Sequence, residues 1–377
     1  MTQYVYGLIG ASTLWPWNAL ITASALAETK LGDTPALYNV FSSVVMTSST
    51  LTSFLLNIYL AYKSSNFRNR IVYGEVIIFT VFMTLTLLNA FTSGISWLVL
   101  MVIVAITSSF GTSFVQNGSM AVTQKMANSN MSLSIMNGQA VAGVLPPLLA
   151  MFFNSTPPRL VAPLTFLSVS LLSAAVLVLF SGLKKYSTLP ANEFIDTNIE
   201  DDMSSEQDIS IEAKHYKQVL TMAWSPMISV LLVFICSLSY PVFANNVHSS
   251  SFSLKLFSPL THFIWNVGDL IGRILCSKQS FQVRSSWLLV ILSVARFGII
   301  GVLLVYVKLS SFNVWVYLFI MFLYGVTSGH LMSSAVVWSQ KKIPHDIQGL
   351  GGSVLVLMMT FGLLLGSGAS FLTTALI

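Results

Sequence analysis

"SWLLVILSVARFGIIGVLLVYV" (residues 286–307) is an apolar run with a single charged residue, Arg296. An α-helix needs roughly 20 predominantly apolar residues to cross the hydrocarbon core of a bilayer. This run has that length and composition, so it predicts a transmembrane helix. Arg296 then needs a polar partner inside the protein, because an unpaired charge is unfavourable in lipid.

The composition of the whole chain extends this prediction. Of the 377 residues, 54% are hydrophobic and 8% are charged, and the mean hydropathy is +0.77. Soluble globular chains carry about 25% charged residues. We therefore expect an integral membrane protein. Outer-membrane barrels are built from short segments of alternating hydrophobicity, which these long apolar runs do not resemble.

Transmembrane helices are predicted along the whole chain, about eleven in all. Their approximate ranges are 4–26, 36–62, 71–92, 97–124, 132–153, 160–182, 217–241, 256–276, 286–307, 312–338 and 347–375. The predicted fold class is an all-α polytopic membrane protein.

Lysine and arginine residues indicate the orientation, because cytoplasmic loops carry an excess of them. If the N-terminus is inside, most of these residues lie on the cytoplasmic side: Lys63, Arg68, Arg70, Lys125, Lys184, Lys185, Lys214, Lys217, Arg273, Lys278, Arg284, Lys341 and Lys342. The other side then holds Lys30, Arg159, Lys255 and Lys308. The sequence thus predicts a cytoplasmic N-terminus and, with an odd number of spans, an extracellular or luminal C-terminus.

Residues 183–215 form the one long polar stretch, and it divides the chain into unequal halves. Most of the acidic residues are here: Glu193, Asp196, Glu200, Asp201, Asp202, Glu206, Asp208 and Glu212. A segment with so few large apolar residues does not order itself, so we expect a flexible cytoplasmic linker. It separates an N-terminal bundle of six spans (1–182) from a C-terminal bundle of five (216–377).

Two helical bundles joined by a central loop are typical of secondary transporters, which hold their substrate near the midplane between the halves. The sequence has no Gly-rich loop that ends in Gly-Lys-Ser/Thr, and therefore no evident nucleotide-driven motor. It also has no cluster of His, Cys and acidic residues at metal spacing, and no Ser or Cys beside a plausible base. We expect neither an enzyme nor a bound metal or cofactor, and no nucleic-acid partner.

"WNVGDLIGR" (residues 265–273) places charges inside an apolar span. Asn266, Asp269 and Arg273 stand at i, i+3 and i+7, on one face of a helix. That face must turn toward protein or water, and Asp269 can pair with Arg273 at i, i+4. The pair predicts a binding site; a purely structural ion pair, or an Arg273 that reaches the interface, are the alternatives.

"GASTLWPWNALITA" (residues 10–23) is a second unusual span, in which proline favours a kink. Leu14, Trp17, Asn18 and Ile21 fall on one helical face. An aromatic plate beside an amide suits a flat ring with polar edges. Trp15 and Trp17 as interfacial anchors are the alternative, but both lie near the middle of the run.

These segments resemble the equilibrative nucleoside transporters, a family with a major-facilitator-like arrangement of six and five helices. The resemblance rests on "TLWPWNALITA" in the first span, "QNGS" in the fourth, "IMNGQAVAG" in the fifth, "WNVGDLIGR" in the eighth and "SGHLMSSAVVWSQKKI" in the tenth, followed by the glycine-rich eleventh. It runs in order from about residue 5 to the C-terminus.

The resemblance implies roles for individual residues. Trp17 would border the nucleobase, with Leu14 and Ile21 close by, and Gln116 would hydrogen-bond the base. Asn117 is a rival for that place, because this chain reads Gln-Asn-Gly where several members have Gln-Gly.

Asp269 and Arg273 would hold the ribose hydroxyls, supported by Asn266. A carboxylate accepts hydrogen bonds from a vicinal diol and a guanidinium donates to it, so the chemistry agrees.

Four further polar residues within or next to spans are candidates for gating or proton coupling: Asn18, Arg70, Glu75 and His330. A histidine changes charge near physiological pH, but inside a membrane it also serves as a neutral hydrogen-bonding link between helices. Glu75 needs a partner wherever it is buried.

The function predicted from the sequence is facilitated diffusion of nucleosides, both purine and pyrimidine, by alternating access, with nucleobases as a further candidate substrate class. A proton-coupled carrier and a non-transporting scaffold or receptor are the alternatives. We expect a monomer in the lipid bilayer. The plasma membrane and a vacuolar or endolysosomal membrane both fit the sequence.

Overall fold

The computed structural model describes residues 2–32, 34–63, 66–126, 129–153, 156–186, 205–247, 249, 251–309 and 312–376. All regular elements in these residues are helices. The first half contains α1 (Thr2–Thr22), α2 (Ser24–Leu31), α3 (Pro35–Tyr62), α4 (Phe67–Leu88), α5 (Gly94–Lys125), α6 (Ser129–Phe152) and α7 (Pro158–Tyr186). The second half contains α8 (Ser205–Met222), α9 (Trp224–Ser237), α10 (Tyr240–Asn246), α11 (Leu254–Cys276), α12 (Ser286–Val307), α13 (Val314–Lys342) and α14 (Gln348–Leu376), with short 3-10 turns at Gln279–Phe281 and His345–Ile347.

The prediction of an all-α polytopic membrane protein is confirmed. Within the described ranges, 9 helices are long and apolar enough to cross a membrane, judged by length and composition. Helices α1 and α11 cover two more predicted spans but are not among these nine, and both carry polar motifs in their interiors. The exact number of spans and the side on which each terminus lies remain predictions.

The seventh predicted span is not one continuous helix. It begins within α8, breaks at Ala223, continues as α9 and breaks again before α10. Pro241 occupies the first turn of α10, where its missing N–H and fixed φ are tolerated, whereas inside a helix it would clash with the carbonyl four residues earlier. The second break therefore follows from the position of Pro241.

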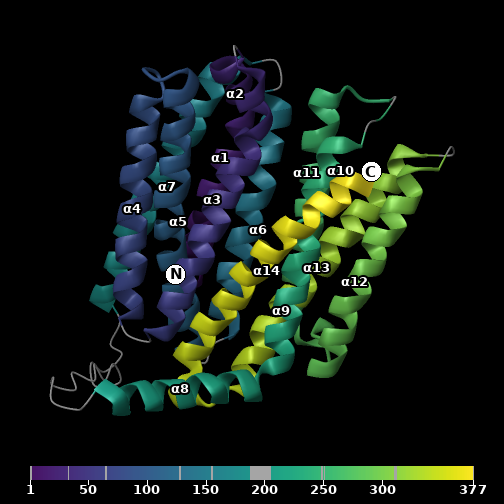
Figure 1. Cartoon of the computed structure of the whole chain (residues 1–377). Coiled ribbons are helices and arrows are strands. Elements are labelled where there is room, and N and C mark those ends of the chain that lie inside the picture. Colours follow the sequence, from purple (N-terminus) through teal and green to yellow (C-terminus); the bar gives the residue numbers. More distant parts are fainter. Residues whose placement is uncertain are drawn as a thin grey trace.

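The predicted linker is wrong in its last part. Residues 187–204 lie outside the described residues, but residues 205–215 belong to α8. Figure 1 shows α8 lying across one end of the molecule, nearly perpendicular to the long helices, and it packs against α9 and α14. Its acidic residues lie in the first half of the helix, and Lys214 and Lys217 lie in the second half. The low hydrophobicity of residues 205–215 therefore did not prevent them from forming a helix.

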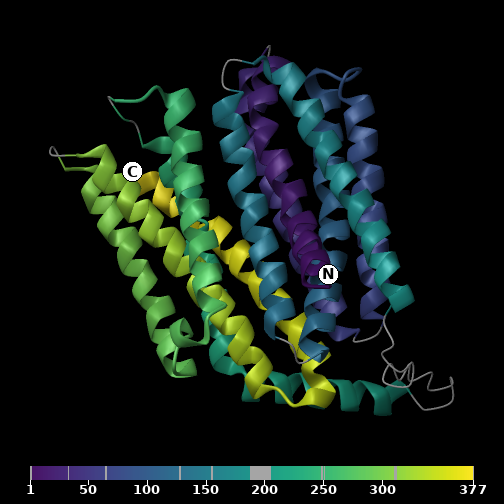
Figure 2. The same cartoon turned by 180° about the vertical axis from the view of Figure 1, so that it is seen from behind.

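The long helices form two bundles, one from α1 to α7 and one from α9 to α13 (Figure 1). Helix α14 runs obliquely between them and packs against α3 and α5 of the first bundle as well as α9 of the second. We call the end where α8 lies the α8 end. The bundles lie close together there and diverge toward the opposite end, as Figure 2 shows from behind.

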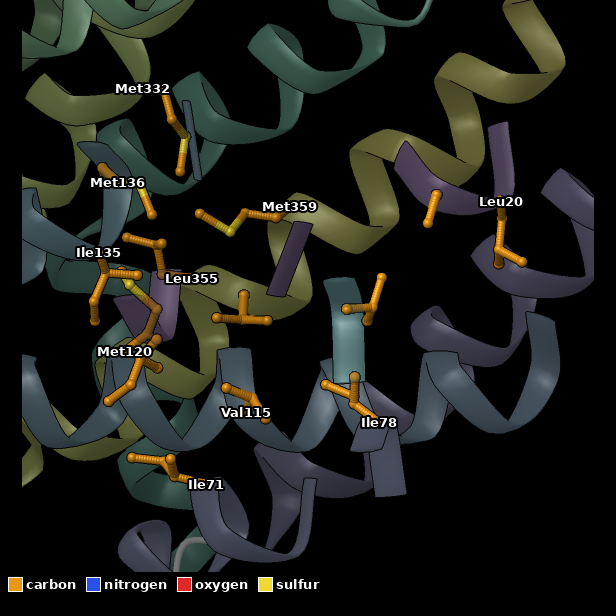
Figure 3. Close-up of a cluster of buried hydrophobic side chains, with 14 of the residues drawn as sticks. Leu20, Ile71, Ile78, Val115, Met120, Ile135, Met136, Met332, Leu355 and Met359 are labelled. Carbon is orange, nitrogen blue, oxygen red and sulfur yellow. The ribbon is translucent and has the colours of Figure 1, made fainter. Parts of the chain in front are cut away.

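The apolar core is continuous between the two bundles. Figure 3 shows Met120 and Met136 of the first half beside Met332 and Met359 of the second, within one cluster of buried side chains. Methionine is flexible and polarisable, so it fills irregular gaps and adapts when its neighbours move. The contact between the halves is therefore apolar and suited to repacking.

Candidate functional site

An ion pair on α11 is the centre of the candidate site. Arg273 Nε lies 2.7 Å from Asp269 Oδ2, one helical turn apart as the spacing predicted. Both side chains are buried, with 9% and 5% of their surface exposed. Arg273 therefore does not extend to a lipid interface, and the pairing predicted from the sequence is confirmed.

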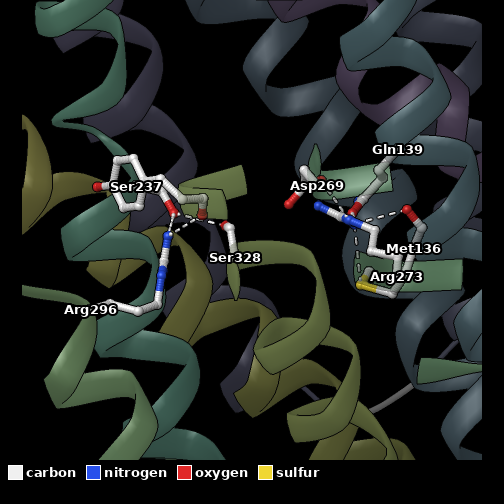
Figure 4. A network of polar contacts seen from close by, with 8 residues as sticks. Met136, Gln139, Ser237, Asp269, Arg273, Arg296 and Ser328 are labelled. Atoms are coloured by element: carbon white, nitrogen blue, oxygen red, sulfur yellow. Dashed lines mark hydrogen bonds and ion pairs between the residues drawn. The ribbon is translucent and has the colours of Figure 1, made fainter. Parts of the chain in front are cut away.

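Arg273 also joins the two halves of the molecule. Its Nη1 donates to the carbonyl of Met136 at 2.8 Å and lies 3.4 Å from Gln139 Oε1, both on α6 (Figure 4). Gln139 in turn donates from Nε2 to Thr13 Oγ1 on α1 at 3.1 Å. A chain of polar contacts thus runs from α11 through α6 to α1.

The second carboxylate oxygen of Asp269 has no partner. Asp269 Oδ1 is buried and makes no hydrogen bond within the described structure. A buried acceptor left unsatisfied costs roughly 1–3 kcal/mol, and more when it is charged. A hydroxyl donor placed beside this oxygen would recover that free energy.

Glycines position α11 against its neighbour α13. A Cβ atom on Gly325 would meet the carbonyl oxygen of Trp265, and one on Gly329 would meet that of Asp269. Small residues one turn apart let two membrane helices approach closely. Because α13 holds the backbone of α11 at Asp269 in this way, the orientation of the ion pair depends on two glycines outside it.

Helix α1 is held against α6 by a glycine contact and by a hydrogen bond. Gly10 lies on the carbonyl of Ile135, and Asn18 Nδ2 donates to the carbonyl of Ala142 at 2.7 Å. Asn18 thus bonds the backbone of α6. The apolar residues predicted beside the base, Leu14, Trp17 and Ile21, are half-buried.

The indole of Trp15 has a hydrogen-bond partner inside the first bundle. Trp15 Nε1 donates to Ser168 Oγ on α7 at 3.0 Å, which directs this indole into the first bundle. The alternative that it anchors the helix at a lipid interface therefore does not describe Trp15.

Gln116 and Asn117 have different environments although they are adjacent. Gln116 is half-buried, and its Nε2 lies 3.4 Å from Met359 Sδ on α14. The side chain of Asn117 is buried, with Oδ1 2.5 Å from Arg70 Nη1 and 3.0 Å from Ser353 Oγ, and Nδ2 3.3 Å from Asn57 Oδ1. The amide of Asn117 is thus used within the protein, whereas Gln116 faces the contact between the halves.

The side chains of Arg70 and His330 bond backbone carbonyls rather than the ion pair. Arg70 donates to the carbonyls of Leu60 and Lys63 at the end of α3, besides its bond to Asn117. His330 Nε2 lies 2.7 Å from the carbonyl of Phe281, in the turn after α11. His330 thus links α13 to a neighbouring backbone segment by a hydrogen bond.

Glu75 is buried inside the first bundle. Its Oε1 contacts Ser12 Oγ on α1. It belongs to a polar cluster separate from the ion pair.

Sequence reasoning missed three residues that adjoin the ion pair. Gln139 bridges α1 and α11, and Tyr240 stacks on Trp265 with ring centroids 3.8 Å apart and planes 4° apart. The indole Nε1 of Trp265 is buried without a partner. Trp265 and Gln139 lay within the motifs "WNVGDLIGR" and "IMNGQAVAG", but their facing partners are on other helices. Spacing within one helix does not reveal such contacts.

Arg296 belongs to a different polar cluster. Its Nη1 donates to the carbonyl of Val233 at 3.0 Å, and its guanidinium lies 5.0 Å from the centre of the Tyr324 ring. Figure 4 shows Ser237 and Ser328 beside it, apart from the Asp269–Arg273 pair. A charged residue in a membrane span needs polar partners inside the protein, and these contacts provide them for Arg296. They also tie α12 to α9 and α13.

Metal ligands do not gather in the part of the chain that the structure describes. No group of three or more His, Cys, Asp or Glu side chains there is arranged to hold a metal ion. Cys236 and Cys276 are both buried as free thiols.

Residues 100–375 match the family described as Nucleoside transporter. Two curated relatives are similar in sequence. The nucleoside transporter FUN26 of Saccharomyces cerevisiae is 28% identical over 440 residues, which cover 98% of this chain and 83% of that protein. Equilibrative nucleoside transporter 3 of Rattus norvegicus is 27% identical over 159 residues, which cover 38% of this chain and 34% of that protein.

Solved structures of membrane transporters have a similar fold. The major facilitator superfamily proton:xylose symporter XylE aligns over 98% of this chain and 86% of its own, with a TM-score of 0.63 and 15% identity. The human organic anion transporter MFSD10 aligns over 99% of this chain and 94% of its own, with a TM-score of 0.67 and 13% identity. At these identities the likeness concerns the fold alone, and it supports the major-facilitator-like arrangement.

Proposed function

Because the chain belongs to the nucleoside transporter family, we propose that it carries purine and pyrimidine nucleosides across a membrane by facilitated diffusion with alternating access. The observation that carries the proposal is the buried Asp269–Arg273 pair at the contact between the halves, with one carboxylate oxygen unpaired. A multi-pass membrane protein with this fold is suited to moving a solute across a bilayer.

The ribose is the part of the substrate that suits the ion pair. Its vicinal hydroxyls donate and accept hydrogen bonds, and Asp269 Oδ1 is an acceptor without a donor. Arg273 is already bonded to α6, so a sugar held by both residues would contact both halves at once. Asn266, one turn earlier on α11, supports this ribose-binding surface.

The nucleobase would lie against α1 and α5. Trp17 offers a flat aromatic face, with Leu14 and Ile21 on the same side of the helix. Gln116 carries an amide that both donates and accepts, as the polar edge of a base requires. In this proposal Asn117 does not read the base, because its amide is held by Arg70, Asn57 and Ser353.

Alternating access requires that one end of the carrier closes while the other opens. Hydrogen bonds join the halves near the α8 end, among them Ser353 to Asn117 and Gln340 to the carbonyl of Thr123. The bundles diverge at the opposite end (Figures 1 and 2). With the α8 end in the cytoplasm, as the basic residues predict, this conformation faces outward, and Arg70 and Asn117 are part of the cytoplasmic closure.

Uptake into proteoliposomes tests the proposal. Purified protein is reconstituted, and entry of radiolabelled uridine and adenosine is followed with and without an inward proton gradient. The test variant is Asp269→Asn, which keeps the shape of the side chain. The matched control is Asp346→Asn, because Asp346 is exposed in the turn before α14.

We expect saturable uptake that levels off at equal concentrations on both sides and does not respond to the gradient. Asp269→Asn should reduce uptake at least tenfold, since the lost charge-assisted bond is worth roughly 1.5–3 kcal/mol, while Asp346→Asn retains it. Folded wild-type protein that moves neither nucleoside would contradict the proposal. Accumulation that occurs only with the gradient would replace it with proton-coupled transport.

A further inference from the structure

Glu75 is the one acidic residue of α4, and it lies fully buried in the first bundle. Its Oε1 contacts Ser12 Oγ on α1. Its Oε2 is buried without a hydrogen-bond partner, and so is the nearby hydroxyl of Ser173 on α7. The carboxyl group thus sits among hydroxyls at the junction of three helices and takes no part in the proposed nucleoside site.

No cation compensates this carboxyl group among the described residues. Helices α5, α7 and α1 pack against α4. The charged residues of α5 and α7, namely Lys125, Arg159, Lys184 and Lys185, lie near the helix ends, and α1 has none. The tyrosines of α1 lie before Ser12, and Tyr6 donates to Met126 Sδ instead.

The arginines of α4 itself are also engaged elsewhere. Arg70 bonds the end of α3 and Asn117, and Arg68 lies over the Phe180 ring. An ionised Glu75 would therefore be an uncompensated charge inside a membrane bundle. Such a group neutralises itself by binding a proton.

The direction of the hydrogen bonds supports a neutral carboxyl group. Ser12 Oγ contacts both the carbonyl of Ile9, at 2.8 Å, and Glu75 Oε1, and its single proton can serve only one of these acceptors at a time. When that proton points to Ile9, the contact with Glu75 needs a second proton, which a protonated Glu75 supplies. The other oxygen of Glu75 and the nearby hydroxyl of Ser173 are both without partners.

The Glu75 cluster is connected to the ion pair through α1. Thr13, the neighbour of Ser12, accepts from Gln139, and Gln139 lies within reach of Arg273. A charge that appeared at Glu75 would disturb Ser12 and thereby the stretch of α1 that carries Trp17. The proton therefore holds in place a helix that the substrate site needs.

We propose that Glu75 is a proton-binding site, separate from the nucleoside site, whose proton stays bound throughout the transport cycle and keeps α1 in position. Because the proton is not exchanged during the cycle, net transport remains equilibrative. Raising the pH far enough to remove the proton places a charge in the bundle and abolishes transport. The proton itself can be detected without any transport, and only the second readout below rests on the proposed function.

Infrared spectroscopy of the purified protein tests the site directly. We expect a carbonyl-stretch band of a protonated carboxyl group at neutral pH that shifts when all glutamates are labelled with carbon-13. Glutamates in water are ionised at that pH. The band should vanish in Glu75→Gln and persist in Asp346→Asn. The isotope experiment uses wild-type protein, so the test stands even if Glu75→Gln does not fold.

Uridine uptake as a function of pH supplies the second readout. Wild-type uptake should fall at least fivefold as the pH rises through the range in which the infrared band disappears. Glu75→Gln mimics the neutral form and should retain its uptake over the same range. Absence of a labelled glutamate band at neutral pH, or an equal fall in wild type and Glu75→Gln, would overturn the proposal. A labelled band in protein that moves no nucleoside would leave the proton site standing and reject the transport function instead.

Discussion

At the scale of single residues, the ion pair joins the two halves and, in the proposed function, also holds the substrate. Arg273 is satisfied by Asp269 and by α6, whereas Asp269 keeps one oxygen unpaired. Removing one partner of a buried pair strands the other charge and costs roughly 3–5 kcal/mol. Asparagine at position 269 keeps the shape and an acceptor oxygen but still removes the charge that faces Arg273, so the thermal midpoint of Asp269→Asn is measured beside its uptake.

Gly329 provides a prediction at this scale. Gly329→Ala places a Cβ atom against the carbonyl of Asp269, so α13 must move away from α11. We expect the free energy of unfolding to fall by roughly 1–3 kcal/mol, seen as a lower thermal midpoint of the detergent-solubilised protein, together with reduced uridine uptake. Gly301→Ala is the matched control, because a Cβ there meets nothing within 4 Å. Equal midpoints for the two variants would refute the close contact.

The candidate site was predictable where its residues share one helix. Asn266, Asp269 and Arg273 follow from a spacing of three and four residues, which periodicity reveals. Gln139 and Tyr240 did not follow, because they reach the site only when α6 and α10 pack beside α11. Those contacts depend on tertiary packing, which the pattern along one helix does not contain.

At the scale of elements, most helices were predictable from apolar runs of membrane length, and α12 occupies the residues expected of it, Ser286–Val307. The exceptions have local causes. Pro241 begins a new helix inside a predicted span, and α8 forms from residues whose polarity suggested a linker. Apolar length identifies a span but does not detect an interruption within it or a helix that lies outside the membrane.

Two glutamines form reciprocal bonds between α5 and α13 near the α8 end. Gln124 Nε2 donates to the carbonyl of Val336 at 3.3 Å, and Gln340 Nε2 donates to the carbonyl of Thr123 at 3.1 Å. Each side chain thus bonds the backbone of the opposite half. These bonds exist only while this end is closed, so they favour the present conformation over the alternative one.

Replacing either glutamine should shift the conformational equilibrium. Gln124→Leu and Gln340→Leu each remove one bond worth about 0.5–1.5 kcal/mol, so the population open at the α8 end should rise roughly two- to tenfold. The control is Gln218→Leu on α8, where the amide contacts only the sulfur of Met222.

Spin labels report this shift as a distance between the halves. Labels at Asn69→Cys and Lys278→Cys, both exposed and on opposite halves, measure the separation near the α8 end. The native thiols Cys236 and Cys276 are buried and need no replacement. Longer distances in the two leucine variants and an unchanged distribution in the control are expected. Identical distributions in all proteins would show that the glutamines do not help to close this end.

At the scale of the whole molecule, the two bundles share an apolar, methionine-rich contact, and Arg273 of the buried ion pair on α11 bonds α6 across it. A contact of this kind can repack while the bundles stay intact, as alternating access requires. A carrier must also release its substrate, so the substrate cannot bind one conformation of the carrier much more tightly than the other.

Counterflow of uridine is the measurement that tests this account most directly. Proteoliposomes are loaded with a high concentration of unlabelled uridine and diluted into a trace of labelled uridine, without any ion gradient. A carrier that alternates between two faces exchanges outgoing for incoming substrate, so labelled uridine should accumulate transiently and then decline. Folded, reconstituted protein that produces no transient accumulation would contradict the account.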